Sequence, residues 1–299
     1  MTSARLTPGD WASALTVVVL WGLNFVAVKT ALRDLPPFLL TSVRFLAVAA
    51  MLAPFFRPRP AQLPGILGIA LVLGVCHFGL LFFGLAGMDA ATTAIVTQLG
   101  APFSVLLAWA VFGETLGLAR LAGLVLAFGG VAVLAGEPTL PALLPLGVAI
   151  TAMFAWAVSN VQIKRIAPID PMALNGWMAL FSAPMLFMVS LAVEDGQAAA
   201  VANADWKTWA GLAYTTVGSS VIAYTLWYRL LGRHDMTRVV PVTLLGPVVA
   251  VSGGVLMLGE VLTWQKVVGG LVTIAGVAVV QFAASRPPPI PPEEPEPGA

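Results

Sequence analysis

The chain has 299 residues, of which 59% are hydrophobic and 10% are charged. About 25% of the residues of a typical soluble domain are charged, so this composition excludes an ordinary soluble protein. The formal net charge is only +1, which gives no long-range field to attract nucleic acid, and we expect no nucleic-acid partner. The single cysteine, Cys76, excludes an internal disulfide and a cysteine-based metal site, and we expect no metal.

Charges, prolines and glycines divide the chain into apolar segments. A hydrocarbon core about 30 Å thick requires roughly 20 residues of α-helix. After a short N-terminal segment, residues 1–10, the predicted spans lie near 11–32, 36–56, 63–86, 90–112, 118–136, 143–164, 171–193, 207–231, 237–258 and 264–284. Strands of a membrane barrel would instead alternate polar and apolar residues. The sequence therefore predicts an all-α integral membrane protein with ten transmembrane helices.

The basic residues predict how these spans are oriented. Excess Lys and Arg remains on the cytoplasmic side of a membrane. The loops on the side of the two termini hold ten of them, whereas the opposite loops hold only Lys29, Arg33, Lys207 and Lys266. We therefore expect both termini to be cytoplasmic, in a cell inner membrane. Residues 285–299 are rich in proline and lack an apolar run, which predicts a disordered cytoplasmic tail.

One stretch of sequence recurs in the two halves. WGLNFVAVK, from Trp21 to Lys29, resembles WAVSNVQIK, from Trp156 to Lys164, and the Gly-Glu pair at Glu114 recurs at Glu260. Residues 11–136 and 143–284 are therefore predicted to be two five-helix repeats. Because five is odd, the second copy inserts in the opposite direction. Inverted repeats are a recurrent plan of secondary transporters, with the substrate site near the midplane.

Several of these motifs together resemble a known family. They are the Trp-Gly-x-Asn start at Trp21, Gly22 and Asn24, the two Gly-Glu turns, and the glycine-rich last helix of each half. The chain resembles the EamA-type branch of the drug/metabolite transporter superfamily over about residues 10–284. This resemblance implies a ten-helix fold and is greatest for bacterial exporters of amino acids and related metabolites.

Aromatic residues occupy equivalent places in the two repeats. Phe78 in the third span aligns with Tyr224 in the eighth, and Trp227 lies beside the latter. Trp21 and Trp156 add a ring from the first and sixth spans. Such rings suit an amphipathic or aromatic ligand, which predicts a cavity lined by them. The alternative is that they face lipid or the membrane interface.

Few polar residues lie deep in the spans. Asn24 follows Trp21 by three residues and Asn160 follows Trp156 by four, so each amide shares a helix face with its tryptophan. These amides, and Gln98 in the fourth span, either hold a substrate's polar end or form hydrogen bonds between helices. Each must find a partner or water, since an unpaired polar group is costly to bury.

Arg44 is the strongly charged residue placed well inside a span. A charge there costs roughly 2.5–3.5 kcal/mol on insertion scales. It could bind a substrate carboxylate, or it could snorkel or cap backbone carbonyls. His77 in the third span could carry a proton near neutral pH, or it could be a hydrogen-bonded structural residue.

Two prolines fall mid-span at equivalent places, Pro102 in the fourth span and Pro247 in the ninth. Each removes a backbone hydrogen bond and predicts a kink, which could act as a hinge or simply improve packing. The glycines of the fifth and tenth spans predict close helix packing.

The sequence contains no phosphate-binding loop of the G-x-x-x-x-G-K-[ST] type, so nucleotide hydrolysis within this chain is not expected. The favoured function is a secondary exporter or facilitator of small amphipathic metabolites, amino acids and aromatic ones among them. Its expected partners are the small-molecule substrate and the lipid bilayer, with no cofactor. The alternative is an intramembrane enzyme, such as a serine hydrolase that uses His77 with Ser219 or Ser220, or a lipid transferase.

Overall fold

The computed structural model describes residues 6–114, 116–138, 143–166, 168–234 and 239–284, and all the regular structure within these ranges is helical. The predicted disordered tail, residues 285–299, and the first five residues lie outside the described residues. The all-helical fold class is confirmed.

The first half of the chain forms helices that follow the predicted spans. They are α1 (Pro8–Ala31), α2 (Pro37–Leu52), a continuous run of η1 (Pro60–Gln62), α3 (Leu63–Ile69), η2 (Ala70–Gly79) and α4 (Leu80–Ala86), then α5 (Ala90–Thr97), α6 (Gly100–Phe112) and α7 (Leu118–Leu134).

The second half repeats this order. It comprises α8 (Leu143–Ile166), α9 (Pro171–Val193), the short α10 (Gln197–Asn203), the run of α11 (Trp206–Ala213), η3 (Tyr214–Ile222) and α12 (Ala223–Arg233), then η4 (Val240–Leu245), α14 (Gly246–Leu258) and α15 (Trp264–Ala284). Among the described residues, seven helices are long and apolar enough to cross a membrane, and α2 and α7 are apolar but shorter. The count of ten spanning helices stays a prediction.

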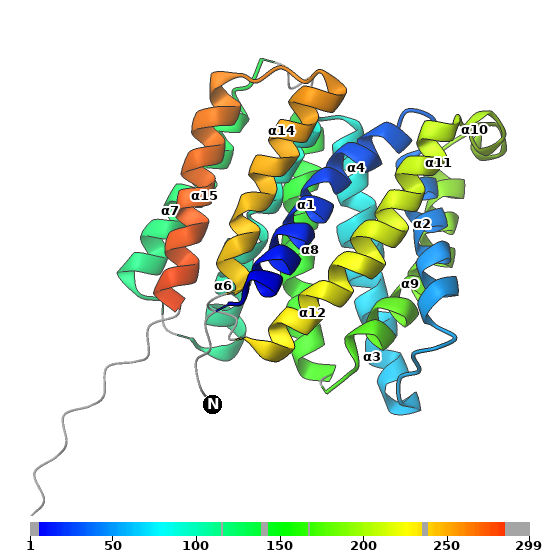
Figure 1. Ribbon diagram of the computed structural model, residues 1–299, viewed down its shortest axis with the longest axis horizontal. Helices are drawn as coiled ribbons and strands as arrows, with labels where there is room; N and C mark the ends of the chain where they lie inside the picture. The colour runs from blue at the N-terminus through cyan, green and yellow to red at the C-terminus, as the bar shows by residue number, and fades with distance from the viewer. Residues whose placement is uncertain (1–5, 115, 139–142, 167, 235–238, 285–299) are drawn as a thin grey trace, which may run out of the picture.

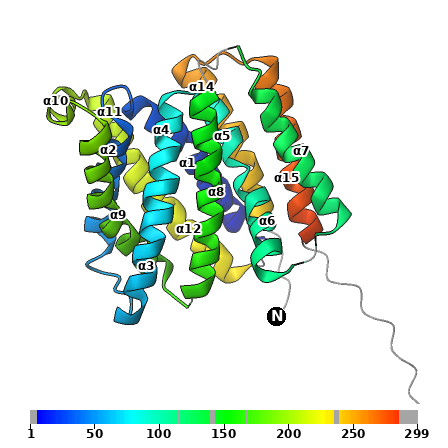
Figure 2. The same ribbon diagram turned by 180° about the vertical axis from the view of Figure 1, so that it is seen from behind.

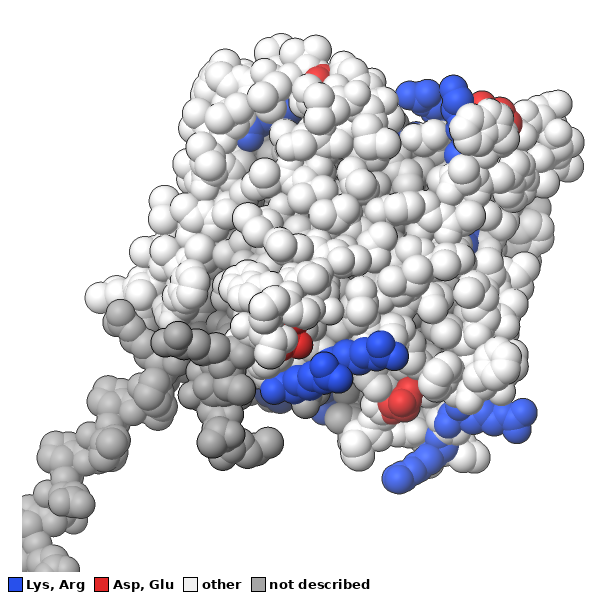
Figure 3. All heavy atoms as spheres, viewed as in Figure 1, with Lys and Arg blue, Asp and Glu red and all other residues white. Residues whose placement is uncertain are grey.

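The surface of the bundle matches a membrane environment. On the face shown in Figure 3, charged side chains gather at the two ends of the molecule, with a broad uncharged belt between them. Large apolar side chains such as Leu71, Val125 and Leu256 are exposed on the helices. A soluble protein rarely exposes so much contiguous apolar surface. Lipid is the solvent that this belt fits.

Equivalent helices of the two halves run in opposite directions. α2 packs along α9 at one side of the bundle and α7 packs along α15 at the other (Figures 1 and 2). Glu194, directly after α9, accepts hydrogen bonds from the backbone N–H groups of Phe38 and Leu39 at the start of α2, at 2.8 and 3.1 Å. Thus α9 ends where α2 begins, as an inverted repeat requires.

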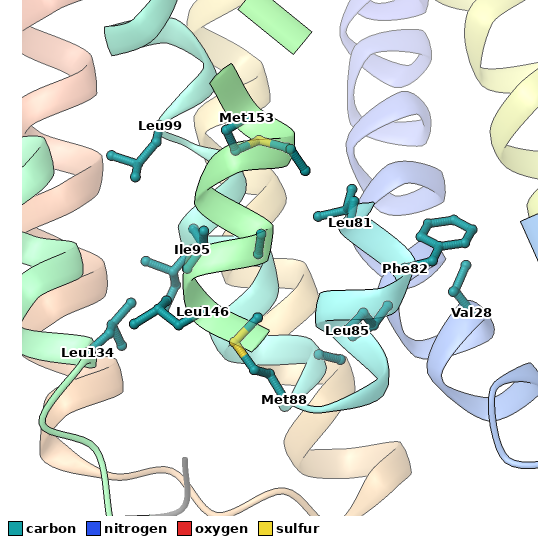
Figure 4. Packing of buried hydrophobic residues seen from close by; sticks show 14 of the residues in the cluster. Val28, Leu81, Phe82, Leu85, Met88, Ile95, Leu99, Leu134, Leu146 and Met153 are labelled. Atoms are coloured by element: carbon teal, nitrogen blue, oxygen red, sulfur yellow. The ribbon is translucent and has the colours of Figure 1, made fainter. Parts of the chain in front are cut away.

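A buried apolar cluster holds the centre of the bundle together. Figure 4 shows Val28 of α1, Leu81 of α4, Ile95 of α5, Leu134 of α7 and Leu146 of α8, which are members of this cluster. Helices in lipid associate through close packing rather than through the hydrophobic effect, so the fit of these side chains, not their apolarity, determines their contribution.

α7 and α15 approach closely because glycines face each other. A Cβ atom added to Gly130 would lie 2.6 Å from the backbone oxygen of Gly269, and one added to Gly276 would lie 2.6 Å from that of Gly123. Even a methyl group at these positions would overlap the facing backbone. The predicted close packing of the fifth and tenth spans is confirmed.

Two adjacent glycines of α7 test this packing. We expect Gly130→Ala to destabilise the protein by about 1–3 kcal/mol, the usual effect of overpacking. A Cβ atom at Gly129 meets nothing within 4 Å, so Gly129→Ala should leave stability unchanged or slightly raised. Thermal unfolding in detergent, followed by tryptophan fluorescence, measures both. Equal melting temperatures for the two variants would contradict the packing argument.

Candidate functional site

The third helical run of each half contains a π-helical stretch. These are η2 and η3, which lie at equivalent places in the two repeats. The π-helix is rare and, where it occurs within α-helices, is frequently found at functional sites. His77 belongs to η2, and Ser219 and Ser220 belong to η3.

Three of the predicted aromatic residues meet at the boundary between the halves. The Trp21 ring of α1 lies edge-on to the Tyr224 ring of α12, with centroids 5.3 Å apart, and 5.4 Å from the Trp227 ring. The Trp21 indole N–H donates a hydrogen bond to the backbone oxygen of Ser219, at 3.3 Å. The rings therefore pack on one another inside the bundle rather than facing lipid singly.

Arg44 of α2 lies beside this ring cluster and is only 3% exposed. Its Nη2 atom donates to the Ser220 hydroxyl at 2.9 Å. Its Cζ atom lies 5.1 Å from the centroid of the Phe78 ring and 5.4 Å from that of Phe82. In the described part of the chain, Nε and Nη1 have no hydrogen-bond partner. The side chain therefore neither snorkels to the surface nor caps a carbonyl.

A chain of hydrogen bonds connects Arg44 to Asn24. The Ser220 hydroxyl donates to the backbone oxygen of Thr215 at 2.9 Å. The Thr215 hydroxyl donates to the Asn24 side-chain oxygen at 2.6 Å. Residues of α2, η3 and α1 are thus connected across the two halves. Sequence reasoning named Ser220 only as a possible nucleophile and missed Thr215.

His77 is buried and bonded to α8. Its Nδ1 lies 2.9 Å from the backbone oxygen of Ala152, and its ring lies 4.6 Å from that of Phe78. Because Ser220 is bonded to Arg44 and Thr215, no serine–histidine pair occurs among these contacts.

The remaining predicted residues form a second group around α8. The Trp156 ring packs on Gly100, where an added Cβ atom would lie 2.8 Å from it. Asn160 donates to the Ser104 hydroxyl of α6 at 3.3 Å. Gln98 lies half-buried at the junction of α5 and α6. This group shares none of the hydrogen bonds or ring contacts described for Trp21. Asn24 and Asn160 each bond to another helix rather than to each other.

Each of the two prolines follows an interruption of the span in which a kink was predicted, and a hinge role for them stays a prediction. The fourth span breaks into α5 and α6 at Gln98 and Leu99, and Pro102 lies in the first turn of α6. Pro247 likewise begins α14, after the 3₁₀ stretch η4. A proline ring clashes with the carbonyl of the residue four positions earlier, so the helix breaks there. The missing N–H then falls in a first turn, where it has no intrahelical partner to lose.

Several charged residues at the end of the bundle opposite to the start of α1, here called the far end, form ion pairs or bond to helix ends. Lys266 lies between Asp89 and Glu137, with nitrogen–oxygen distances of 2.5 and 2.8 Å. The Lys29 ammonium donates to three carbonyls at and beyond the end of α4. The Glu260 carboxylate accepts from two backbone N–H groups at the start of α5.

A cavity of about 320 Å³ opens beside this far-end cluster, lined by Lys29, Arg33, Asp89 and Glu260 among others. Most of these charges already serve helix ends or ion pairs, so they offer few free groups to a ligand. Within the described ranges, no three His, Cys, Asp or Glu side chains are grouped so that they could hold a metal ion.

Comparisons with known proteins fit this architecture. Residues 11–136 and 143–282 each match the EamA-like transporter family. Proteins of Salmonella typhimurium and Escherichia coli are each 36% identical to this chain, over 91% of it and 95% of their own length, and both are called "Probable amino-acid metabolite efflux pump". A crystal structure that is 21% identical superposes with a TM-score of 0.62 over 93% of this chain and 99% of its own, which shows a shared fold.

Together the helical fold, the apolar belt and these matches define a multi-pass membrane transporter. The chain belongs to the EamA-like transporter family, and the two matched stretches are its two copies of the family domain.

The hydrogen bond between Thr215 and Asn24 can be tested by a double-mutant cycle with Thr215→Val and Asn24→Leu. Interhelical hydrogen bonds in membranes contribute about 0.6 kcal/mol on average and about 1.7 at most, and we expect a coupling energy in this range. The measurement is reversible unfolding in mixed micelles. The Thr225 hydroxyl bonds to Val221 within its own helix, so a control cycle of Thr225→Val with Asn24→Leu should show no coupling. Absence of coupling in the first cycle would show that this hydrogen bond does not join the halves.

Proposed function

We propose that the protein is a secondary transporter that exports small amphipathic metabolites, amino acids and aromatic amino acids among them, across the inner membrane. The names of the two relatives support an amino-acid metabolite as substrate. The observation that carries the proposal is the meeting of rings and polar groups from both halves, with Trp21 against Tyr224 and Arg44 against Ser220.

The aromatic and the polar residues of this site are proposed to contact different parts of the substrate. Trp21, Phe78, Tyr224 and Trp227 present apolar faces to the body of the substrate, and aromatic faces also hold cations. The polar chain from Asn24 to Arg44, with His77 close to Phe78, presents donors and acceptors to its polar end. Gln98, Trp156 and Asn160 are proposed to line the passage on the α8 side.

Transport then follows from movement of the halves around this site. The breaks before Pro102 and Pro247 lie at equivalent places in the two halves, and interrupted helices are the parts of transporters that form ion and substrate sites. We propose that they are the points at which each half bends.

Substitutions at the ring cluster test the proposed site. Trp21→Ala, Tyr224→Ala and Trp156→Ala, and Asn24→Ala in the polar chain, should each lower flux several-fold. The reason is that one lost desolvated contact reduces binding by on the order of 1–3 kcal/mol. The measurement is counterflow of labelled amino acids in proteoliposomes.

Trp109 supplies the matched control for these variants. It is 53% exposed on α6, so Trp109→Ala removes an indole that faces outward and should transport like the wild type. If all four site variants transported normally, the proposed site would be wrong.

Cysteine labelling tests the orientation that accompanies this function. Ala198 in α10 and Ala61 in η1 are both exposed. In a Cys76→Ala background, we expect Ala198→Cys to react with a membrane-impermeant maleimide from outside intact cells. Ala61→Cys should react only after the membrane is opened. The reverse pattern would place both termini outside.

A further inference from the structure

The Arg44 guanidinium carries hydrogen-bond donors that the fold leaves unused. A guanidinium has five N–H groups, one on Nε and two on each Nη. Nη2 bonds to Ser220, whereas Nε and Nη1 find no acceptor in the described part of the chain. Three N–H groups of a charged side chain that is 3% exposed are therefore unpaired. A buried unsatisfied polar group in a native structure requires an explanation, and a missing ligand is one.

The side chains around these donors are aromatic rings. Such rings attract a cation, but they do not accept hydrogen bonds as a carboxylate does. The rings of Phe45, Phe78 and Phe82 lie 5.7, 5.1 and 5.4 Å from the Arg44 Cζ atom. Cation–π attraction reduces the cost of burying the charge. The planar edge of the guanidinium, with donors in a fixed fork, is matched by the two oxygens of a carboxylate.

The fold also supplies no negative charge to Arg44. Ion pairs among the described residues include Arg120 with Glu114, Arg233 and His234 with Asp10, and Lys266 with Asp89 and Glu137. All of them lie at the ends of the bundle, and none includes Arg44. Within the part of the chain that the structure describes, the buried positive charge of Arg44 therefore has no carboxylate partner. A substrate's ammonium group would add a second positive charge.

We propose that this site selects its substrate by the carboxylate, which Arg44 binds, and that a free ammonium group is not required. Amino acids whose amino group is acylated, and other carboxylates with an apolar or aromatic body, are then substrates of the same class as free amino acids. Compounds that keep the ammonium but lack the carboxylate are not. This inference rests on the proposed function, because it names the chemical class of substrate for that site.

Ser220 and Thr215 hold the guanidinium in place for this task. The bond from Nη2 to Ser220 fixes one side of the group, and Ser220 is itself bonded to Thr215. They are positioning residues. The free edge of Arg44, not these hydroxyls, contacts the carboxylate.

Competition in counterflow on the wild-type protein is the first test. The labelled substrate is phenylalanine, and the competitors are N-acetylphenylalanine and phenylalaninamide at about pH 6.5, below the usual α-amino pKa. We expect N-acetylphenylalanine to compete within a few-fold of phenylalanine. The amide should compete roughly ten- to a hundredfold more weakly, the effect of losing charge-assisted hydrogen bonds. An amide that competes as well as the acetylated acid overturns the inference while leaving the transport function intact.

Variants of Arg44 assign this preference to its side chain. Arg44→Gln should abolish the discrimination between acid and amide, and Arg44→Lys, which keeps the charge without the planar fork, should retain part of it. Arg57 is an exposed arginine in the loop that follows α2, and Arg57→Gln should discriminate as the wild type does. Full discrimination in a folded Arg44→Gln protein contradicts the assignment.

The melting temperature of the wild-type protein with each compound tests this inference separately from the proposed function. This measurement does not depend on whether a variant folds. A ligand that binds the folded state raises the melting temperature, so N-acetylphenylalanine should raise it and phenylalaninamide should not. If no amino acid is transported but this difference appears, export of amino acids fails and carboxylate selection stands. If phenylalanine is transported but neither compound stabilises the protein or competes, the inference fails and the transport function stands.

Discussion

The buried guanidinium of Arg44 determines which side chains must surround it at the centre of this protein. A charge there is costly unless it faces water, a partner or a ligand. The fold surrounds Arg44 with rings and gives it one hydroxyl, on Ser220. That hydroxyl is available because η3 is π-helical, so that Ser220 bonds back to Thr215, five residues earlier. The irregular helix and the buried cation are therefore parts of one arrangement.

The two ends of the bundle are held by different means. At the far end Lys266, whose side chain is fully buried, connects Asp89 and Glu137, and carboxylates cap the first turns of α2 and α5. At the opposite end the His234 Nε2 atom lies 2.9 Å from the Asp10 carboxylate with both side chains nearly buried, and Arg233 lies 4.0 Å from Asp10 with a side chain that is 72% exposed. Exposed ion pairs contribute little, whereas breaking a buried one is strongly destabilising. Both ends of the bundle are thus held by buried polar contacts.

Sequence reasoning reached the architecture more readily than the site. Long apolar runs and the repeat at Trp21 and Trp156 predict helices and their inversion, since both depend only on local composition and spacing. The meeting of Trp21 with Tyr224 and Trp227 could be expected from the sequence, because the alignment of the two repeats puts aromatic residues at equivalent positions. The partner of Arg44 could not, because Arg44 and Ser220 lie on helices of different halves, and their contact depends on how those helices pack. The break at Gln98 fits the kink expected of Pro102, because a proline ring clashes with the carbonyl four residues earlier.

The irregular segments occur in symmetric pairs, and this symmetry connects fold to mechanism. η2 and η3 are equivalent in the two halves, as are the α5–α6 junction and η4. The two halves are inverted, so the same bend opens one half toward one side of the membrane and the other half toward the opposite side. If the halves exchanged their two conformations, the central residues would stay in place while the site became open to the other side of the membrane. Arg44 lies on α2, which packs along α9, its equivalent in the other half, so it lies close to the axis about which such an exchange would occur. A substrate held there would remain bound to the same groups while access passes from one side to the other.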